Sequence, residues 1–246
     1  MKITKKYTDL FALGKKIIPN VVIGVLVLST GVLCLAPMEE SVSASGAESS
    51  VYYNAGENGK GVSLLFNVYW GREEVYQILD ILSEYDATAT FFIGGCWADD
   101  NVDCLRDIYI AGHEIGNHGY FHKDHTTLNL LENQREISAC NRFIELALGE
   151  SPTLFAPPSG AYGNDAVSAT LALRMKTILW SKDTIDWRDK DSELIYERAT
   201  KGVKKGDFIL MHPMPSTVEA LKNILLYYKN NGLETVSVSE NLQEKG

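Results

Sequence analysis

The chain has 246 residues, of which 45% are hydrophobic and 22% are charged, and its formal net charge at pH 7 is −9. This composition is typical of a globular protein. The acidic balance argues against binding to nucleic acid or to an anionic surface, because both require clustered positive charge. A neutral or cationic ligand fits it better, although a charged surface also serves solubility.

The first 44 residues have the organisation of an export segment. An apolar run at residues 17–36 follows a basic block that contains Lys2, Lys5, Lys6, Lys15 and Lys16. The run is long enough to cross a hydrocarbon core, and lysines on its N-terminal side predict that the remainder is exported. Residues 1–44 are therefore a signal peptide cleaved after Ala44 or an uncleaved membrane anchor. Both alternatives place the domain on the outer face of the membrane or release it to the cell envelope.

Residues 45–60 are rich in Ser, Gly, Ala and Glu and are predicted to form a flexible linker. Short apolar runs then alternate with amphipathic stretches up to residue 242. The predicted strands are Val62–Val68, Ala87–Ile93, Thr153–Phe155, Thr177–Trp180, Phe208–Met211 and Thr235–Val238. The predicted helices are Glu73–Tyr85, Val102–Ala111, Leu130–Leu148, Asp165–Ala172, Ser192–Gly202 and Thr217–Asn230. This alternation predicts one α/β domain at residues 61–242, with a parallel sheet that is open or closed into a barrel.

Polar side chains follow several of the predicted strands. Asn67 ends the first strand, Asp183 and Asp186 follow the fourth, and His212 follows the fifth. Because chemistry gathers at the carboxyl ends of parallel strands, we expect these residues to lie close together. A histidine such as His212 can act as a general acid at neutral pH, and the alternative is a hydrogen-bonded histidine at a strand end.

His118 and His122 are the strongest candidate pair. Their spacing places both imidazoles on one face if the segment is helical or tightly turned, so that they can hold one divalent metal. The alternative is two surface or capping histidines, because this spacing often arises by chance. Among the other histidines, His113 is predicted to be packed and hydrogen-bonded, and His125 to be exposed in a polar turn.

Three cysteines follow the predicted linker: Cys96, Cys104 and Cys140. The chain has no Cys-x-x-Cys pair, which argues against a zinc knuckle. In an exported domain Cys96 and Cys104 can close a small disulfide loop, and the alternative is that both stay free. Cys140 lies on a helical pattern and is predicted to be buried and inert.

Five segments together resemble one family, the polysaccharide deacetylases with a NodB homology domain, or carbohydrate esterase family 4. The similar segments are Gly112–His122 (metal-binding motif), Phe155–Gly160 (Arg-Pro-Pro-Tyr-Gly), Asp183–Trp187, Leu210–Pro213 and Phe66–Gly71. The last of these is similar to the Phe-Asp-x-x-Trp-Gly motif of a sporulation-associated branch. The resemblance runs through the whole predicted domain, with the motifs in the family's order.

The resemblance implies a single distorted (β/α) barrel that removes acetyl from N-acetylglucosamine-type residues of peptidoglycan or chitin-like polymers by metal-assisted hydrolysis. His118 and His122 would bind zinc or a similar divalent metal, and His212 would be the general acid. Asp183 or Asp186 would orient that acid. The backbone near 159–162 would help to hold the oxyanion. The residues expected to contact the polysaccharide are Trp70, Pro157, Tyr162 and Trp187.

The chain departs from the family pattern at four positions. Asn67 occupies the position of the catalytic base, and an amide cannot accept a proton from water as a carboxylate can. Val68 occupies the third metal-ligand position and cannot coordinate, which predicts a weakened metal site. Ala156 replaces the arginine that steadies the base, and Ser159 replaces the neighbouring tyrosine.

Three hypotheses follow. The first is a metal-dependent polysaccharide N-deacetylase in which Asp183 or a metal hydroxide replaces the base. The second is a non-catalytic, glycan-binding pseudoenzyme at the cell envelope or spore, with sugar contacts from Trp70, Trp97, Trp187 and Tyr162. The third is a purely structural envelope or spore protein. Retention of the histidines and aspartates favours the first hypothesis, whereas Asn67 and Ala156 favour the second.

Overall fold

The computed structural model describes residues 51–242, so the predicted signal peptide or anchor at residues 1–44 lies outside the described residues. Within the described range, no helix has the length and apolar character needed to cross a membrane.

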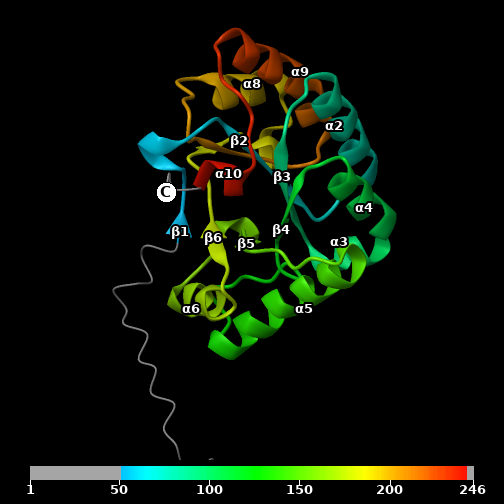
Figure 1. Ribbon diagram of the computed structural model, residues 1–246, viewed down its shortest axis with the longest axis vertical. Helices are drawn as coiled ribbons and strands as arrows, with labels where there is room; N and C mark the ends of the chain where they lie inside the picture. Colours follow the sequence, from blue (N-terminus) through cyan, green and yellow to red (C-terminus); the bar gives the residue numbers. More distant parts are fainter. Residues whose placement is uncertain (1–50, 243–246) are drawn as a thin grey trace, which may run out of the picture. The chain divides into compact units, whose positions relative to one another are not determined.

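A curled parallel sheet forms the centre of residues 51–242 (Figure 1). Its strands are β1 (Val51–Tyr52), β2 (Ser63–Val68), β3 (Ala89–Ile93), β4 (Glu114–Asn117), β5 (Leu154–Phe155), β6 (Lys176–Ile178), β7 (Lys182–Asp183) and β8 (Phe208–Met211). The strand order is β1-β6-β5-β4-β3-β2-β8-β7, and all neighbouring strands are parallel. The sheet stays open because β1 and β7 are its two edges. These features confirm the distorted (β/α) barrel expected from the sequence.

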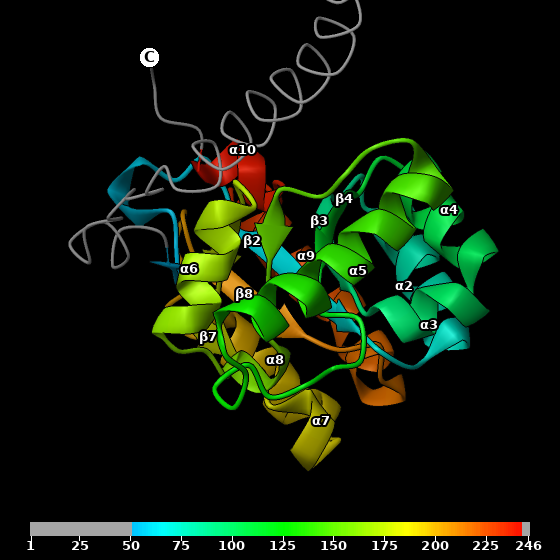
Figure 2. The ribbon, with the colours of Figure 1, turned by 90° about the horizontal axis from the view of Figure 1, so that it is seen from below.

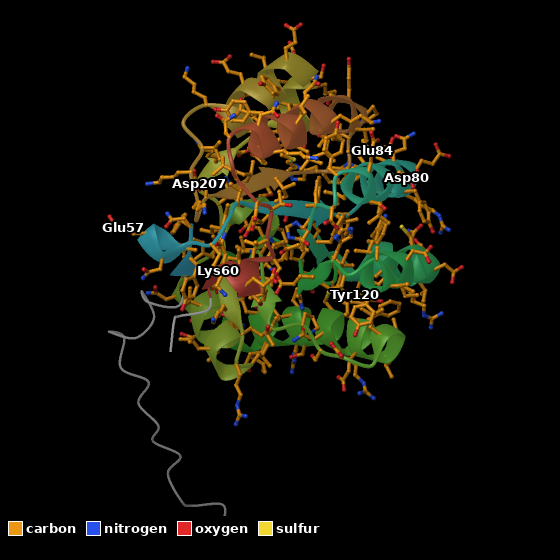
Figure 3. All side chains as sticks on the ribbon, turned by 45° about the horizontal axis from the view of Figure 1, so that its top comes forward. Glu57, Lys60, Asp80, Glu84, Tyr120 and Asp207 are labelled. Carbon is orange, nitrogen blue, oxygen red and sulfur yellow. The ribbon has the colours of Figure 1, made fainter. Side chains whose placement is uncertain are left out.

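Helices form an arc around the outside of this sheet (Figure 1). The helices of the arc are α2 (Arg72–Glu84), α3 (Gly95–Asp100), α4 (Val102–Ile110), α5 (Leu130–Leu148), α6 (Asn164–Ala172), α8 (Ser192–Thr200) and α9 (Pro215–Asn230). The short helix α7 (Asp186–Asp189) follows β7, and α10 (Val238–Leu242) begins in the inner cluster of the sheet. Two 3-10 turns are η3 (Gly56–Asn58) and η4 (Pro158–Gly160). In α2, Ile78 and Leu82 are buried while Asp80 and Glu84 lie on the outer side (Figure 3). Lys222 of α9 pairs with Glu84 at 2.8 Å. The helical spacing of apolar residues thus decides which face meets the sheet.

Alternating side chains along each strand divide the core into two parts. In β2, Leu64, Phe66 and Val68 pack in the outer core beneath the helices, whereas Leu65 belongs to an inner cluster. Val238 at the start of α10 packs in the inner cluster, beside the first residues of the central strands. The amino ends of these strands are therefore covered, which leaves their carboxyl ends for a site.

Besides containing β4, β7, α3 and α7, which were not predicted, the structure differs from the sequence expectations at two segments. Part of the predicted linker is ordered, because Val51–Tyr52 pairs with β6 and η3 follows it. The predicted strand Thr235–Val238 reduces to one bridge between Val62 and Thr235, after which α10 begins. In both segments tertiary pairing rather than local composition decides the conformation.

Candidate active site

A cavity of about 400 Å³ lies at the carboxyl ends of the strands. It is lined by Asn67, Trp70, His118, His122, Ser159, Trp180, Asp183, Trp187, Leu210 and His212. Residues from β2, β7, β8 and the loops after β4 and β8 therefore meet in one place, as the strand-end rule predicts.

The two candidate metal histidines lie in the loop after β4 and not on a helix. Gly119 has a φ of +75° and His122 a φ of +54°, so a tight turn brings the imidazoles together. Their ring centroids are 5.1 Å apart at an interplanar angle of 72°. Tyr69 packs against the other side of the pair, with its ring centroid 4.7 Å from that of His122.

Hydrogen bonds define the protonation of His118. Its Nδ1 lies 2.7 Å from the carbonyl oxygen of Ala156. A carbonyl can only accept, so Nδ1 carries the proton and Nε2 keeps its lone pair for a ligand. Burial, together with the neighbouring His122, lowers the pKa of His118 to about 3. Burial also lowers the pKa of His122. Both imidazoles are therefore neutral at pH 7, as metal ligation requires.

Buried polar groups hold the loop that carries these histidines. The side-chain oxygen of Asn117 accepts a hydrogen bond from the Gly119 N–H at 2.7 Å. Glu136 on α5 accepts one from the Phe121 N–H at 2.5 Å. At the start of α3, the Gly95 N–H donates to the Gly119 carbonyl at 2.9 Å. The loop is thus fixed by β4, α3 and α5 together.

His212 and Asp186 form the second polar centre. His212 Nδ1 donates to Asp186 Oδ1 at 2.7 Å, and its backbone N–H donates to Oδ2 at 2.6 Å. Asp186 is fully buried and also accepts from the Thr217 hydroxyl at 2.7 Å and the Trp187 N–H at 2.8 Å. Asp186 therefore orients His212 with Nε2 free. Asp183 lines the cavity separately and accepts the Ile185 N–H at 2.8 Å.

Comparisons with known proteins show to which family the chain belongs. A family model described as polysaccharide deacetylase matches residues 54–178. The chain belongs to the polysaccharide deacetylase family. The family's members are hydrolases of N-acetyl amide bonds.

Among the relatives of the chain is a peptidoglycan-N-acetylglucosamine deacetylase from Bacillus cereus, which is 35% identical over 79% of this chain and 94% of its own. An uncharacterised Bacillus subtilis protein, YlxY, is 32% identical over 86% of this chain, which spans only 66% of that relative. A crystal structure of a carbohydrate esterase family 4 pseudoenzyme from Bacillus anthracis superposes with a TM-score of 0.76, at 36% identity over 79% of this chain and 69% of that one. A mutant of that pseudoenzyme has restored enzymatic activity.

In this member of the polysaccharide deacetylase family, the positions that depart from the expected motifs have distinct surroundings. Asn67 is buried in the cavity wall, and its Oδ1 has no hydrogen-bond partner in residues 51–242. Val68 faces the outer core, on the other side of the strand. Ala156 packs in the inner apolar cluster beside Leu65 and Phe92. The resemblance would put the base, the third metal ligand and the arginine at these three positions, where the side chains present cannot fill those roles.

The remaining donors fit a divalent metal in part. The described residues contain no cluster of three or more His, Cys, Asp or Glu side chains arranged as a metal site. His118 and His122 supply two neutral imidazoles, and the unpartnered Oδ1 of Asn67 supplies one oxygen in the same cavity. An amide oxygen is a weaker ligand than a carboxylate, so zinc or a similar ion would be held less tightly.

Several predicted residues lie elsewhere. Pro157 is buried and Tyr162 donates to or accepts from Tyr53 at 2.7 Å, and neither lines the cavity. Trp97 is 6% exposed in the outer core and cannot contact a sugar. Trp180, which with Trp187 flanks the two aspartates in the sequence and was a candidate for stacking on a sugar, lines the cavity, as does Leu210, which was not predicted to do so. Trp180 stands at the end of a predicted strand, which is the signal that identified the other site residues.

The other histidines and the cysteines can also be compared with the sequence predictions. His113 is packed against Phe91, as expected, with ring centroids 5.3 Å apart. The prediction that His125 is exposed is wrong, because it is 1% exposed and its Nδ1 lies 2.6 Å from Asn133 Oδ1. Cys96 and Cys104 are free thiols, so they do not form the disulfide loop that was one of the two alternatives. Cys140 is buried, and burial raises the pKa of its thiol, which makes it inert as predicted.

Proposed function

We propose that this protein binds an N-acetylated polysaccharide of the cell wall in the cavity at the strand ends, without the turnover of the catalytic members of its family. Asn67 carries the proposal, because it puts a neutral amide at the position of the base, in a cavity that keeps His118, His122, Asp183 and His212. Ala156 supports it, since the arginine that would steady a base is missing too.

The cavity wall suits a sugar ring. Trp70 and Trp187 are 40% and 50% exposed, and Trp180 lines the same cavity. Exposed indoles offer flat apolar faces with a polar N–H, which is what an amino sugar with an apolar ring face and polar edges requires. Asn67 Oδ1 is a buried acceptor that has no partner among residues 51–242, so it is available to the N–H of an acetamido group.

A second candidate function is slow hydrolysis of the same N-acetyl group. The intact pair of His212 and Asp186 favours it, because His212 Nε2 remains free to protonate a leaving amine. Asp183 would then accept the proton of the attacking water, since it is the carboxylate that lines the cavity. A divalent metal on His118 and His122 would polarise the acetyl carbonyl.

The export segment predicted at residues 1–44 supports a location outside the cytoplasmic membrane, with the domain either released to the cell envelope or tethered through that segment. The relationship to a peptidoglycan deacetylase supports the cell wall as the location of the polysaccharide.

The test measures binding of N-acetylglucosamine tetrasaccharide to the full-length protein by calorimetry and acetate release with added zinc. We expect saturable binding that Trp187→Ala weakens about tenfold or more, because it removes an exposed indole from the wall. Tyr109→Ala is the matched control, since Tyr109 is an exposed aromatic residue on α4 outside the cavity.

Each outcome decides between the candidates. Binding without acetate release supports the proposal. Zinc-dependent acetate release that His118→Ala abolishes supports hydrolysis instead. Absence of binding to this tetrasaccharide and to peptidoglycan fragments would overturn both and leave a structural role.

A further inference from the structure

A second groove adjoins the candidate active site. Its volume is about 610 Å³, and it is lined by Trp70, Gly71, Glu74, Trp187, Lys190, Pro213, Met214 and Pro215. Trp70 and Trp187 line both this groove and the site cavity, so the two spaces meet at the two indole rings. A polymer seated in the site cavity would therefore place its neighbouring unit in the groove.

The wall formed by Trp70 is fixed before any ligand binds. Its ring lies parallel to that of His212, with centroids 5.6 Å apart and an interplanar angle of 7°. Its Nε1–H donates to the sulfur of Met214 at 3.2 Å. Gly71 has a φ of +78°, and a Cβ there would lie 2.5 Å from the Pro213 carbonyl oxygen. The loops after β2 and β8 therefore touch at Gly71 and form one side of the groove.

Lys190 supplies the positive charge of the groove. It follows α7, which projects from the body next to α8 (Figure 2), and its side chain is exposed. Arg188 and Arg198 both bind Asp189, and these bonds lower the pKa of Asp189 to about 2. The Asp189 carboxylate is therefore already paired with two arginines and does not bind Lys190. Within residues 51–242 the Lys190 ammonium makes no hydrogen bond or ion pair.

We propose that this groove binds a neighbouring sugar of the polysaccharide that carries a free carboxylate, as N-acetylmuramic acid does where no peptide is amide-linked to its lactyl group, and that Lys190 determines this specificity. The inference rests on the proposed function, because it concerns the unit next to the bound N-acetyl sugar. The indoles would contact the ring, and the ammonium would pair with the carboxylate. A chitin-like polymer has no such carboxylate.

The net charge of the whole chain does not oppose this pairing. The formal charge is −9, but charges farther away than about 8 Å are largely screened at physiological ionic strength. The local balance in the groove is one cation, Lys190, and one acid, Glu74. Because no ion pair joins the two, each is available to a ligand.

The test compares three ligands on the full-length protein by calorimetry. They are a tetrasaccharide of alternating N-acetylglucosamine and N-acetylmuramic acid, the same tetrasaccharide with its carboxylates amidated, and N-acetylglucosamine tetrasaccharide. We expect Lys190→Gln to weaken binding of the acidic ligand about three- to fivefold and to leave both neutral ligands unchanged. The preference for the acidic ligand should also shrink as salt is added.

Lys229→Gln is the matched control, because it makes the same change in net charge at the exposed far end of α9. Glu74→Gln should strengthen binding of the acidic ligand by removing the like charge. An equal effect of Lys190→Gln on charged and neutral ligands, or no effect, would overturn the inference. If the wild type binds the neutral tetrasaccharide without preferring the acidic one, the inference fails while the proposed function stands. If it binds none of the three, both fail.

Discussion

Asp186 and Asp183 show how two aspartates three residues apart serve different purposes. Asp186 is fully buried and accepts four hydrogen bonds, two of them from His212. Asp183 is partly exposed and accepts one, from a backbone N–H. The sequence left open which of them orients His212, because both positions follow the same strand. Burial and hydrogen bonding in the folded chain select Asp186.

This difference predicts unequal effects of the same substitution. Asp186→Asn should lower the free energy of unfolding by about 2–4 kcal/mol, because an amide NH₂ would face buried donors. Asp183→Asn should cost less than about 1 kcal/mol, since it loses one partly exposed interaction. Urea unfolding followed by circular dichroism measures both. Equal losses would show that Asp186 is not the buried anchor of His212.

Asn67 and Ala156 are expected to act as a pair. Asn67→Asp alone places a carboxylate in a buried wall, and Ala156→Arg alone places a cation among apolar side chains, so each should destabilise the fold. The double variant should be more stable than the sum of the two losses predicts, by about 1–3 kcal/mol, because the new charges can pair. A double-mutant cycle in urea measures this coupling. Strictly additive losses would mean that the two positions do not contact each other.

At the level of elements, the pair of histidines shows both the strength and the limit of sequence patterns. The four-residue spacing correctly indicated that His118 and His122 lie together, but they do so through a turn with positive φ at Gly119 and His122. The spacing of apolar residues located the long helices and the strands β2, β3 and β8, because an element buried on one face has apolar residues at the period of its structure. Short elements such as α7 and β7 carry too few residues for a period to appear.

Other elements were missed for reasons of context. β4 was not predicted as a strand, because its four residues, Glu-Ile-Gly-Asn, have little β propensity and are held by β3 and β5. His125 looked like part of a polar turn, yet Phe155 and Asn133 enclose it. Both features depend on partners distant in the chain, which no local window contains.

β4 requires Gly116 for close packing, and this requirement is testable. A Cβ at Gly116 would lie 2.4 Å from Cδ1 of the fully buried Phe92. Gly116→Ala should therefore destabilise the fold by about 1–3 kcal/mol and weaken glycan binding by shifting His118, two residues later.

Gly163→Ala is the control for this prediction, because a Cβ there meets nothing within 4 Å and its φ is −138°. Thermal unfolding and calorimetry provide the measurements. If Gly116→Ala is as stable as the wild type, β4 tolerates a methyl group at this position, and the close approach of Phe92 does not require glycine.

At the scale of the whole molecule, buried histidines make the fold sensitive to acid. Burial lowers the pKa of His113 to about 4 and also lowers that of His125. The unfolded chain, with an ordinary histidine pKa near 6.5, binds these protons more tightly than the folded chain. Stability is therefore fully present above pH 6.5 and declines as the pH falls; for His113 the decline continues towards pH 4 at about 1.4 kcal/mol per pH unit.

Unfolding free energies between pH 4 and 8 test this dependence. His113→Gln should reduce the slope below pH 6.5 while leaving the slope between pH 7 and 8 unchanged. An unaltered slope below pH 6.5 would mean that His113 is not responsible for the acid sensitivity.

The central claim is that the loss of the base and its arginine leaves a binding site without turnover, and acetate release tests it most directly. The measurement compares wild type with the double variant Asn67→Asp, Ala156→Arg on N-acetylglucosamine tetrasaccharide and peptidoglycan, with added zinc. The account predicts no release by wild type above the level of His118→Ala, and measurable release by the double variant. Release by the wild type that His118→Ala abolishes would contradict it.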